Sequence, residues 1–429
     1  MQQLIVPLTA AEATDAARFG PKAANLAALA QAGLPTPGGF CLDAEAYRIQ
    51  IAALGLEAAV ADIDSLEPGK ARRAALDMKL GLLDRPIAPE LLDPLLAAWR
   101  RMVDESGGAP SVVRSSALVE DRFGSSFAGQ FESYLGLETE EEFITAVRSC
   151  WAALWSTRVL RYMATHGASP AETAMAVLIQ PLVAARVSGG GLSRASEDEM
   201  VLNAAWGMGS QIAQGEVVPE RIVLGRDGTL RETALGRKYR AVGCMHNGGP
   251  GVAKPLFSQR CLNAEQSVEL GRMLRRVEDL MGMPVEIEWA LDDAGFKLLQ
   301  GRPLHTQPSA VPDDVWLHQS GSQRGLSGHP AGVGWSSGTA RVVNCECELS
   351  LVGPGEILVT RVAGPALSQI LPRVAGVVAE LGGSTSHLAS LARERGIPMV
   401  LGVLDATERI PNGARIAVDG VAGVVRWLQ

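Results

Sequence analysis

The chain has 429 residues, a length typical of two or three domains, and 47% of them are apolar. Its formal charge of −8 argues against a general nucleic-acid binder, which needs a basic surface. No apolar run is long enough to cross a bilayer, and the first residues lack a signal-peptide pattern. The six cysteines are dispersed, and the close pair Cys345 and Cys347 lacks a second pair to complete a metal site. We therefore expect a cytoplasmic protein with reduced thiols.

The first part of the chain combines helical and β-like segments. Residues 21–33, 42–104 and 141–167 have helical periodicity, and the last segment predicts a single amphipathic helix. Residues 111–136 shift to short β-like runs, and AMAVLIQPLV predicts a buried strand.

Glycines gather in the next part of the chain, at residues 188–191 and 207–215. They could form phosphate-cradling loops, but ordinary turns are favoured because no strict phosphate-binding motif accompanies them. Residues 262–281 predict a second amphipathic helix. The strands VEIEWALDD and GFKLLQGRP follow, joined by a turn.

Residues 306–330 lack periodicity and are rich in Pro, Ser and Gly, which is typical of a linker. Residues 331–429 alternate strands with short helical pieces in an α/β layout. The sequence thus predicts an α/β and α+β multidomain protein with a module at 1–305, itself divided into subdomains at roughly 1–185 and 186–305. Three residues of the linker offer polar and aromatic groups for a small ligand, although an ordinary linker is favoured: Trp316, His318 and Arg324.

Charged and polar residues lie in the two strands that follow residue 284. Glu286 and Glu288 alternate on the first strand, and Gln300 and Arg302 alternate on the second. A turn between the strands would bring Glu288 near Gln300 and Arg302. A carboxylate and an amide oxygen suit Mg²⁺, and nearby cations suit a triphosphate. A solvated hairpin face with a salt bridge is equally compatible with this pattern.

The stretch GGSTSHLASLARERG places His387 after a flexible, hydroxyl-rich turn. We expect His387 in the first turn of a helix capped by Ser or Thr, where backbone N–H groups stabilise an anion. A neutral imidazole is nucleophilic at neutral pH, and Thr385, Ser386 and Arg393 could bind phosphoryl oxygens. A capping or structural histidine is the alternative, and we interpret His387 as a phosphate carrier. The other histidines have no such context and are interpreted as surface or structural residues: His166, His246, His305, His318 and His329.

The histidine stretch resembles the phosphohistidine signature of the phosphoenolpyruvate (PEP) synthase and pyruvate phosphate dikinase family. The family's ATP-grasp module is similar to four further stretches: FGPKAANLAALAQAGLPTPGGF, SVVRSSALVEDRFGSSFAGQFESYLG, GMGSQIAQGEVVPERIVL and VEIEWALDDAGFKLLQGRP. Together they cover most of the chain. The resemblance implies an N-terminal ATP-grasp domain followed, after the linker at 306–330, by a compact swivelling phosphohistidine domain at 331–429.

The resemblance also implies roles for individual residues. It makes Lys22, Arg114 and Arg302 ligands of the ATP phosphates, with Gln180 and Glu286 as further nucleotide-binding residues. It makes Glu288 and Gln300 the Mg²⁺ ligands. His387 would be the phosphorylated residue, with Thr385 and Arg302 assisting catalysis.

The reaction that the resemblance implies is a dikinase-type phosphotransfer with ATP and Mg²⁺. The histidine attacks the β-phosphate of ATP and AMP is released. The terminal phosphate then leaves to water or to phosphate, with water favoured, and the remaining phosphoryl group passes to an acceptor.

Three features depart from the family pattern. Ser210 stands where the family's G-x-G motif is usually followed by an acidic residue, and VSGGGLSRA lacks the usual apolar-Phe-Thr-Arg sequence. The chain ends at Gln429 without the large barrel that binds pyruvate in PEP synthase. It also lacks the antibiotic-binding domain of the family's rifampin phosphotransferases. Pyruvate as acceptor is therefore disfavoured unless a partner supplies its site.

Three functions remain open at this point. The first is phosphotransfer to a small-molecule hydroxyl or enol acceptor bound by this chain. The second is a phosphohistidine subunit whose acceptor site lies on a separate partner protein. The third is a regulatory protein that binds nucleotide without transferring phosphate, which the presence of all the expected site residues disfavours.

Overall fold

The computed structural model describes residues 3–120, 127, 129–238, 256–257, 259–306 and 325–428. The chain divides into two compact units. The first comprises Met1–Ala184 and Ala294–Arg302, and the second comprises Ala185–Asp293 and Pro303–Gln429. The predicted domain and subdomain bounds stay predictions. Part of the predicted linker, including Trp316, His318 and Arg324, lies outside the described residues, as does His246.

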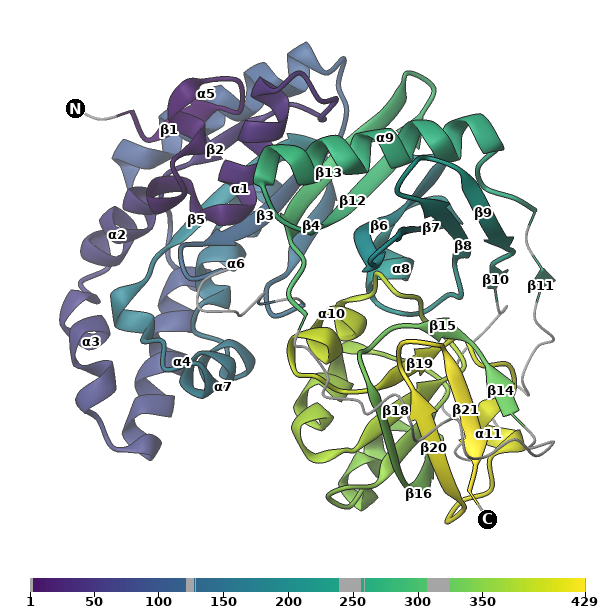
Figure 1. Cartoon of the computed structure of the whole chain (residues 1–429). Helices are drawn as coiled ribbons and strands as arrows, with labels where there is room; N and C mark the ends of the chain where they lie inside the picture. The colour runs from purple at the N-terminus through teal and green to yellow at the C-terminus, as the bar shows by residue number, and fades with distance from the viewer. Residues whose placement is uncertain are drawn as a thin grey trace. The chain divides into compact units, whose positions relative to one another are not determined.

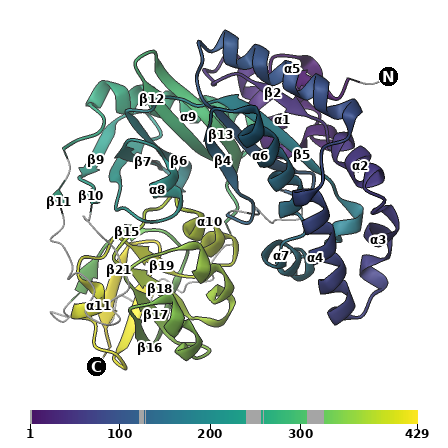
Figure 2. The same cartoon turned by 180° about the vertical axis from the view of Figure 1, so that it is seen from behind.

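The first unit contains an antiparallel sheet with the strand order β1-β2-β5-β3-β4. Helices α1, α2, α5 and α6 pack against this sheet (Figure 1), and Figure 2 shows α4 beside α6 from behind. The strands of this unit are β1 (Ile5–Pro7), β2 (Phe40–Leu42), β3 (Ser111–Ala117), β4 (Ser133–Leu137), β5 (Met175–Pro181) and, but for its last residue, β13 (Gly295–Pro303). Its helices are α1 (Ala16–Gln31), α2 (Ala44–Ala53), α3 (Glu57–Asp62), α4 (Pro68–Asp84), α5 (Pro89–Glu105), α6 (Glu140–Ala153) and α7 (Thr157–Thr165).

One predicted helix is in fact two. The segment 141–167, predicted as a single amphipathic helix, forms α6 and α7. The break follows from capping, because the Ser156 hydroxyl accepts a hydrogen bond from the Val159 backbone N–H and begins a new helix. The other end of this segment has a complete capping box between Thr139 and Glu142.

Helix α1 contains a kink that a helical periodicity does not reveal. Gly20 has a φ of 73°, in the left-handed region, and Pro21 follows it. A Cβ at Gly20 would lie 2.4 Å from the Ser116 carbonyl oxygen, so only glycine fits this close approach to β3. The kink turns the helix immediately before Lys22.

Among its described residues, the second unit contains two large sheets and one small sheet. The first of them runs β12-β6-β7-β8-β9, entirely antiparallel, with helix α9 packed against it. A small two-stranded sheet pairs β10 with β11. The elements of this part are β6 (Val187–Ser196), β7 (Glu199–Trp206), α8 (Ser210–Ala213), β8 (Glu220–Gly225), β9 (Leu230–Ala234), β10 (Arg237–Lys238), β11 (Leu256–Phe257), α9 (Ala264–Met281) and β12 (Val285–Asp292).

The other sheet of the second unit has eight strands in the order β14-β21-β20-β16-β17-β18-β19-β15, with parallel pairing from β16 to β19. Apolar residues of its central strands form a core in which Val359, Val378 and Val418 are fully buried. Its elements are β14 (Gly325–Ser327), β15 (His329–Pro330), β16 (Trp335–Val343), β17 (Ile357–Thr360), β18 (Gly376–Ala379), α10 (His387–Glu394), β19 (Met399–Leu401), α11 (Ala406–Arg409), β20 (Arg415–Asp419) and β21 (Val424–Trp427).

Two predictions for the second unit need correction. Residues 188–191 are neither a phosphate loop nor a turn, because they lie inside strand β6. Residues 325–330, predicted as linker, form β14 and β15, which pair with β21 and β19. These short strands contain Gly, Ser and Pro, a composition typical of loops. They become strands only by pairing with strands that are distant in the sequence.

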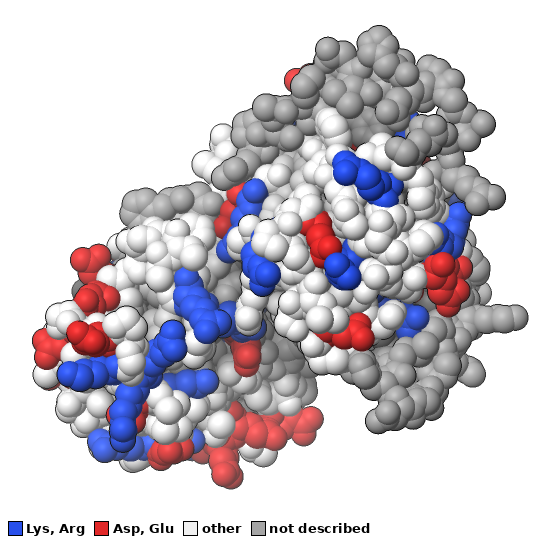
Figure 3. Space-filling view, turned by 90° about the horizontal axis from the view of Figure 1, so that it is seen from below, with Lys and Arg blue, Asp and Glu red and all other residues white. Residues whose placement is uncertain are grey.

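On the face drawn in Figure 3, acidic and basic side chains of the described residues are interspersed. This distribution accords with a chain that has 39 basic and 47 acidic residues. In the part of the chain that the structure describes, no helix is long and apolar enough to cross a membrane.

Candidate active site

The first unit brings together Arg114 and Gln300, two of the residues predicted to bind ATP and Mg²⁺. Arg114 lies on β3 and donates to the Gln300 side-chain oxygen at 2.9 Å and to the Leu299 carbonyl at 2.8 Å. Gln300 is buried, and its carboxamide oxygen has a second lone pair beyond the one used by Arg114. The structure thus brings a cation and an amide oxygen, distant in the sequence, side by side.

Gln180 and Arg302 are two further residues of the first unit that the sequence predicted to bind nucleotide. Gln180 on β5 pairs with Val112 on β3, so its side chain lies on the same side of the sheet as that of Arg114. Its amide nitrogen donates to the Gly38 carbonyl at 3.3 Å. Arg302 on β13 is buried. Buried polar groups of this kind are held by hydrogen bonds. The binding of nucleotide by Gln180 and Arg302 stays a prediction.

Lys22 follows the kink in α1 and reaches β3. Its ammonium group donates to the Ser115 carbonyl at 2.6 Å and to the Glu120 carboxylate at 3.3 Å. Both side chains of this ion pair are largely buried. The lysine is therefore fixed at one end of β3, where Gly20 allows the close approach.

The second unit carries the other carboxylates on one side of its first sheet. Glu288 on β12 pairs with Gly190 on β6, and Gly190 pairs with Asn203 on β7. Paired residues point to the same side of a sheet, and Glu286 does so as well because it lies two residues from Glu288. We call this side, defined by Glu286, Glu288, Gly190 and Asn203, the docking face.

The docking face receives the loop that precedes His387. A Cβ at Gly190 would lie 2.5 Å from the Thr385 Cβ, so Thr385 sits directly on a strand that lacks a side chain at this point. The Asn203 side-chain oxygen accepts hydrogen bonds from the backbone N–H and the hydroxyl of Thr385. Gly383 lies equally close to Pro219, where a Cβ would approach the proline ring to 2.4 Å. The glycines of β6 are thus explained by close packing.

His387 is the first residue of helix α10 and is partly exposed. The Ser386 hydroxyl caps the helix by accepting a hydrogen bond from the Ala389 N–H at 3.3 Å. The prediction of a serine-capped helix that begins at His387 is therefore confirmed. The N-terminus of a helix favours a negative charge, because the N–H groups of its first turn are oriented toward that end.

The residues predicted to surround the phosphoryl group have other partners in this structure. Thr385 bonds Asn203, and Ser386 caps α10. Arg393 donates to the Ser384 carbonyl at 2.6 Å and lies 3.4 Å from the Glu286 carboxylate. Their proposed contacts with phosphate stay predictions.

Sequence reasoning did not single out Asn203 and Ser390, and it interpreted Gly190 as part of a loop or turn. Asn203 left a signal, because it is a polar residue inside the apolar strand VLNAAW and is fully buried. Ser390 lies one helical turn after His387 and is buried against Glu286. Neither role follows from spacing alone, since both depend on contacts between segments far apart in the chain.

The predicted Mg²⁺ ligands Glu288 and Gln300 supply a carboxylate and an amide oxygen, a donor set that suits this hard cation. Among the described residues, no three His, Cys, Asp or Glu side chains gather as a metal site. Mg²⁺ commonly takes only one or two protein ligands and completes its shell with phosphate oxygens and water. Glu288 belongs to the second unit and Gln300 to the first, and their assignment to Mg²⁺ stays a prediction.

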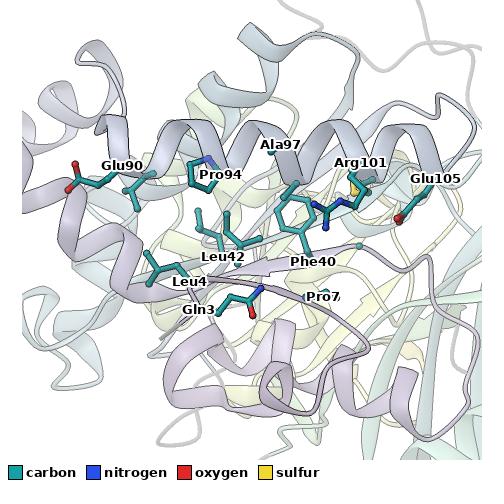
Figure 4. Close-up of a pocket in the computed structure, with 15 residues that line it drawn as sticks. Gln3, Leu4, Pro7, Phe40, Leu42, Glu90, Pro94, Ala97, Arg101 and Glu105 are labelled. Atoms are coloured by element: carbon teal, nitrogen blue, oxygen red, sulfur yellow. The ribbon is translucent and has the colours of Figure 1, made fainter. Parts of the chain in front are cut away.

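A cavity of about 680 Å³ lies elsewhere in the first unit, between β1, β2 and α5 (Figure 4). Its lining is largely apolar and includes Leu4, Phe40, Leu42 and Pro94, with Arg101 at the wall. None of the described site residues lines it, so it is separate from the candidate active site.

Comparison with known proteins identifies two domains in the chain. A family model described as pyruvate phosphate dikinase, AMP/ATP-binding domain, matches residues 16–318. A second, described as PEP-utilising enzyme, mobile domain, matches residues 352–423. The predicted architecture, an α/β and α+β protein with a nucleotide-binding module followed by a mobile domain, is confirmed.

Curated relatives extend the match over most of the chain. Phosphoenolpyruvate synthase of Aeropyrum pernix is 31% identical over 457 residues, which cover 95% of this chain and 56% of that protein. Phosphoenolpyruvate synthase of Escherichia coli is 28% identical over 447 residues, which cover 95% of this chain and 55% of that protein. The chain spans just over half the length of these relatives. From the two matched modules, it belongs to the pyruvate phosphate dikinase and PEP synthase family of PEP-utilising enzymes.

Proposed function

We propose that this chain is an ATP-dependent phosphotransferase that carries a phosphoryl group on His387. The main observation behind the proposal is the close packing of Thr385 against Gly190, the residue that pairs with Glu288 on the neighbouring strand. This contact places the residues before His387 on the same side of the sheet as the predicted Mg²⁺ ligand. The close packing of this loop beside the predicted Mg²⁺ ligand supports a role of His387 in phosphate transfer.

The proposed first half-reaction has two steps. The nucleophilic ring nitrogen of neutral His387 attacks the β-phosphorus of ATP, and the bond to the α-phosphate oxygen breaks to release AMP. Water or inorganic phosphate then takes the terminal phosphoryl group and leaves a single phosphoryl group on the ring. The second half-reaction transfers this group to an acceptor oxygen and restores the neutral histidine.

The chain's own residues would orient the nucleotide. Lys22, Arg114 and Arg302 supply positive charges for phosphate oxygens. Each guanidinium can bind two oxygens at once, and the lysine ammonium acts as a point charge. Mg²⁺, held by Glu288 and Gln300, would neutralise charge on the polyphosphate. Gln180 is proposed as a further nucleotide ligand, whereas Glu286 has a different partner in this structure.

The test is intact-protein mass spectrometry at neutral to alkaline pH after addition of Mg·ATP, with AMP quantified. Acid must be avoided because phosphohistidine is acid-labile. Wild type should gain one phosphoryl group with stoichiometric AMP, and His387→Ala should gain none. Nucleotide binding without either product in the wild type would contradict the proposal.

We propose a small-molecule hydroxyl or enol as the acceptor. The charged protein, freed of ATP, should lose its phosphoryl group on addition of the right compound and form the corresponding phosphate ester. If transfer occurs only when a second protein is added, the acceptor site belongs to that partner. PEP formation from pyruvate by the isolated chain would show that no separate acceptor protein is needed.

A further inference from the structure

Glu286 was predicted from the sequence to bind nucleotide, but its contacts point to another role. Its carboxylate accepts a hydrogen bond from the Ser390 hydroxyl at 2.7 Å and lies 3.4 Å from an Arg393 nitrogen. Both side chains of the ion pair are at most 7% exposed. Glu286 comes from strand β12, whereas Ser390 and Arg393 come from α10, the helix that begins with His387.

Contacts within the histidine module orient the two donors, Ser390 and Arg393. Ser390 and Arg393 are three residues apart and therefore share one side of the helix. Arg393 also donates to the Ser384 carbonyl at 2.6 Å and to the Ser390 hydroxyl at 3.1 Å. These contacts hold the guanidinium in place before any contact with Glu286. The carboxylate of β12 is the complementary group, supplied by the docking face.

The electrostatics suit a contact that forms and separates. A buried ion pair loses hydration when it forms, so its net contribution to stability is small compared with its attraction. If the helix leaves the docking face, the Glu286 carboxylate loses its partners on α10 and becomes accessible to water. Burying one partner without the other is unfavourable. The pair therefore favours the position of the helix in which Glu286 and Arg393 contact each other.

We propose that Glu286 is a positioning residue that holds the His387 helix on the docking face through Ser390 and Arg393. This inference rests on the proposed function, in which His387 receives phosphate while its module is docked. It also predicts release after phosphorylation. A phosphoryl group adds about −1.5 to −2 charges at His387, one helical turn from Ser390, and is repelled by the Glu286 carboxylate.

The test compares the full-length variants Glu286→Gln and Ser390→Ala with wild type. Three quantities are measured: hydrogen–deuterium exchange in residues 383–393, the rate of His387 phosphorylation, and the affinity for a non-hydrolysable Mg·ATP analogue. Glu286→Gln should raise exchange in this segment and slow phosphorylation about tenfold or more, with analogue affinity within about twofold of wild type. Ser390→Ala should cause a smaller change, and the double variant should be no worse than Glu286→Gln.

Glu278→Gln is the matched control. Glu278 is also a buried carboxylate paired with arginines, Arg226 at 2.6 Å and Arg194 at 3.0 Å, but it lies on α9 away from the histidine helix. We expect this control to lower the thermal stability of the unit, while exchange in residues 383–393 should stay as in wild type. It separates loss of docking from general destabilisation.

Two results would overturn the proposal. One is lower analogue affinity for Glu286→Gln with unchanged exchange, which would make Glu286 a nucleotide ligand. The other is wild-type exchange and phosphorylation in Glu286→Gln. If the wild type itself forms no phosphohistidine, the proposed function fails, and the exchange comparison still decides whether Glu286 holds the helix.

Discussion

The side-chain oxygen of Asn203 accepts two hydrogen bonds from Thr385, from the backbone N–H at 3.2 Å and from the hydroxyl at 3.1 Å. Asn203 is fully buried on β7, and Thr385 lies two residues before the proposed phosphohistidine. A single carboxamide oxygen thus accepts hydrogen bonds from both donors of Thr385, the residue that packs against Gly190. The contact joins the nucleotide-binding module to the histidine module within the second unit.

Asn203→Leu should weaken docking of the histidine loop. The variant keeps a similar side-chain volume but leaves the Thr385 N–H without an acceptor, at a cost of about 1–3 kcal/mol. We expect a fall of about tenfold or more in the rate of His387 phosphorylation. Thr385→Val removes only the hydroxyl bond and should cause a smaller fall. Equal rates in both variants and wild type would show that Asn203 does not position the loop.

Gly190→Ala and Gly191→Ala should act differently although the residues are neighbours. The alanine Cβ at 190 would meet Thr385 at 2.5 Å, whereas at 191 it would meet Ile287 and Leu202 at 3.1 Å on the opposite side of the sheet. Gly190→Ala should therefore slow phosphorylation with little change in the thermal midpoint. Gly191→Ala should lower the midpoint because the contact is in the core. If phosphorylation slows in both variants in proportion to the fall in thermal midpoint, the two glycines do not differ in this way.

Arg114→Lys should lower the affinity for Mg·ATP about tenfold, because a lysine cannot reproduce the paired donors of a guanidinium. Arg114 also contacts the Gln300 side chain, so its loss would disturb a predicted Mg²⁺ ligand. Isothermal titration with a non-hydrolysable ATP analogue measures the effect. Arg100→Lys, in an exposed ion pair with Glu140 in the same unit, is the control and should bind as wild type. Wild-type affinity in Arg114→Lys would remove Arg114 from the nucleotide site.

His329 should make the protein less stable in mild acid. Burial, followed by the nearby charges of Arg221 and Arg237, lowers the pKa of His329 to about 3. Its Nδ1 atom has no hydrogen-bond partner among the described residues. In the unfolded chain a histidine has a pKa of about 6.5, so below that pH the unfolded state binds a proton that the folded state does not. Stability present above pH 6.5 is therefore lost as the pH falls from about 6.5 toward 3, by up to about 1.4 kcal/mol per pH unit.

His329→Gln removes this titration and should show a smaller drop in thermal midpoint between pH 7 and pH 5 than wild type. Thermal unfolding followed by circular dichroism at both pH values measures the difference. His166→Gln is the control, because His166 lies in the first unit and is partly exposed. An equal drop in wild type and His329→Gln would assign the acid sensitivity to other groups.

Local features were predictable where the signal lies within a few residues. The serine cap and His387 at the start of α10 follow from adjacent residues, and so do the two strands β12 and β13 with the short turn between them. The division of residues 141–167 into α6 and α7 was missed because the apolar periodicity continues through the break. The Ser156 cap outweighs that periodicity by satisfying an N–H at the start of the second helix.

The sequence by itself determined the family, the order of the modules, the capped histidine and the set of polar residues. These depend on motifs and short-range periodicity, which are written along the chain. Only the tertiary structure decided that Gly190 and Asn203 receive Thr385 and that Glu286 binds the histidine helix. The bonded residues are 182 positions apart for Asn203 and Thr385, and 104 for Glu286 and Ser390. Contacts at such separations depend on how whole helices and strands pack. The sequence around a glycine, an amide or a carboxylate does not show whether that residue makes a docking contact, lies in a turn or binds a ligand.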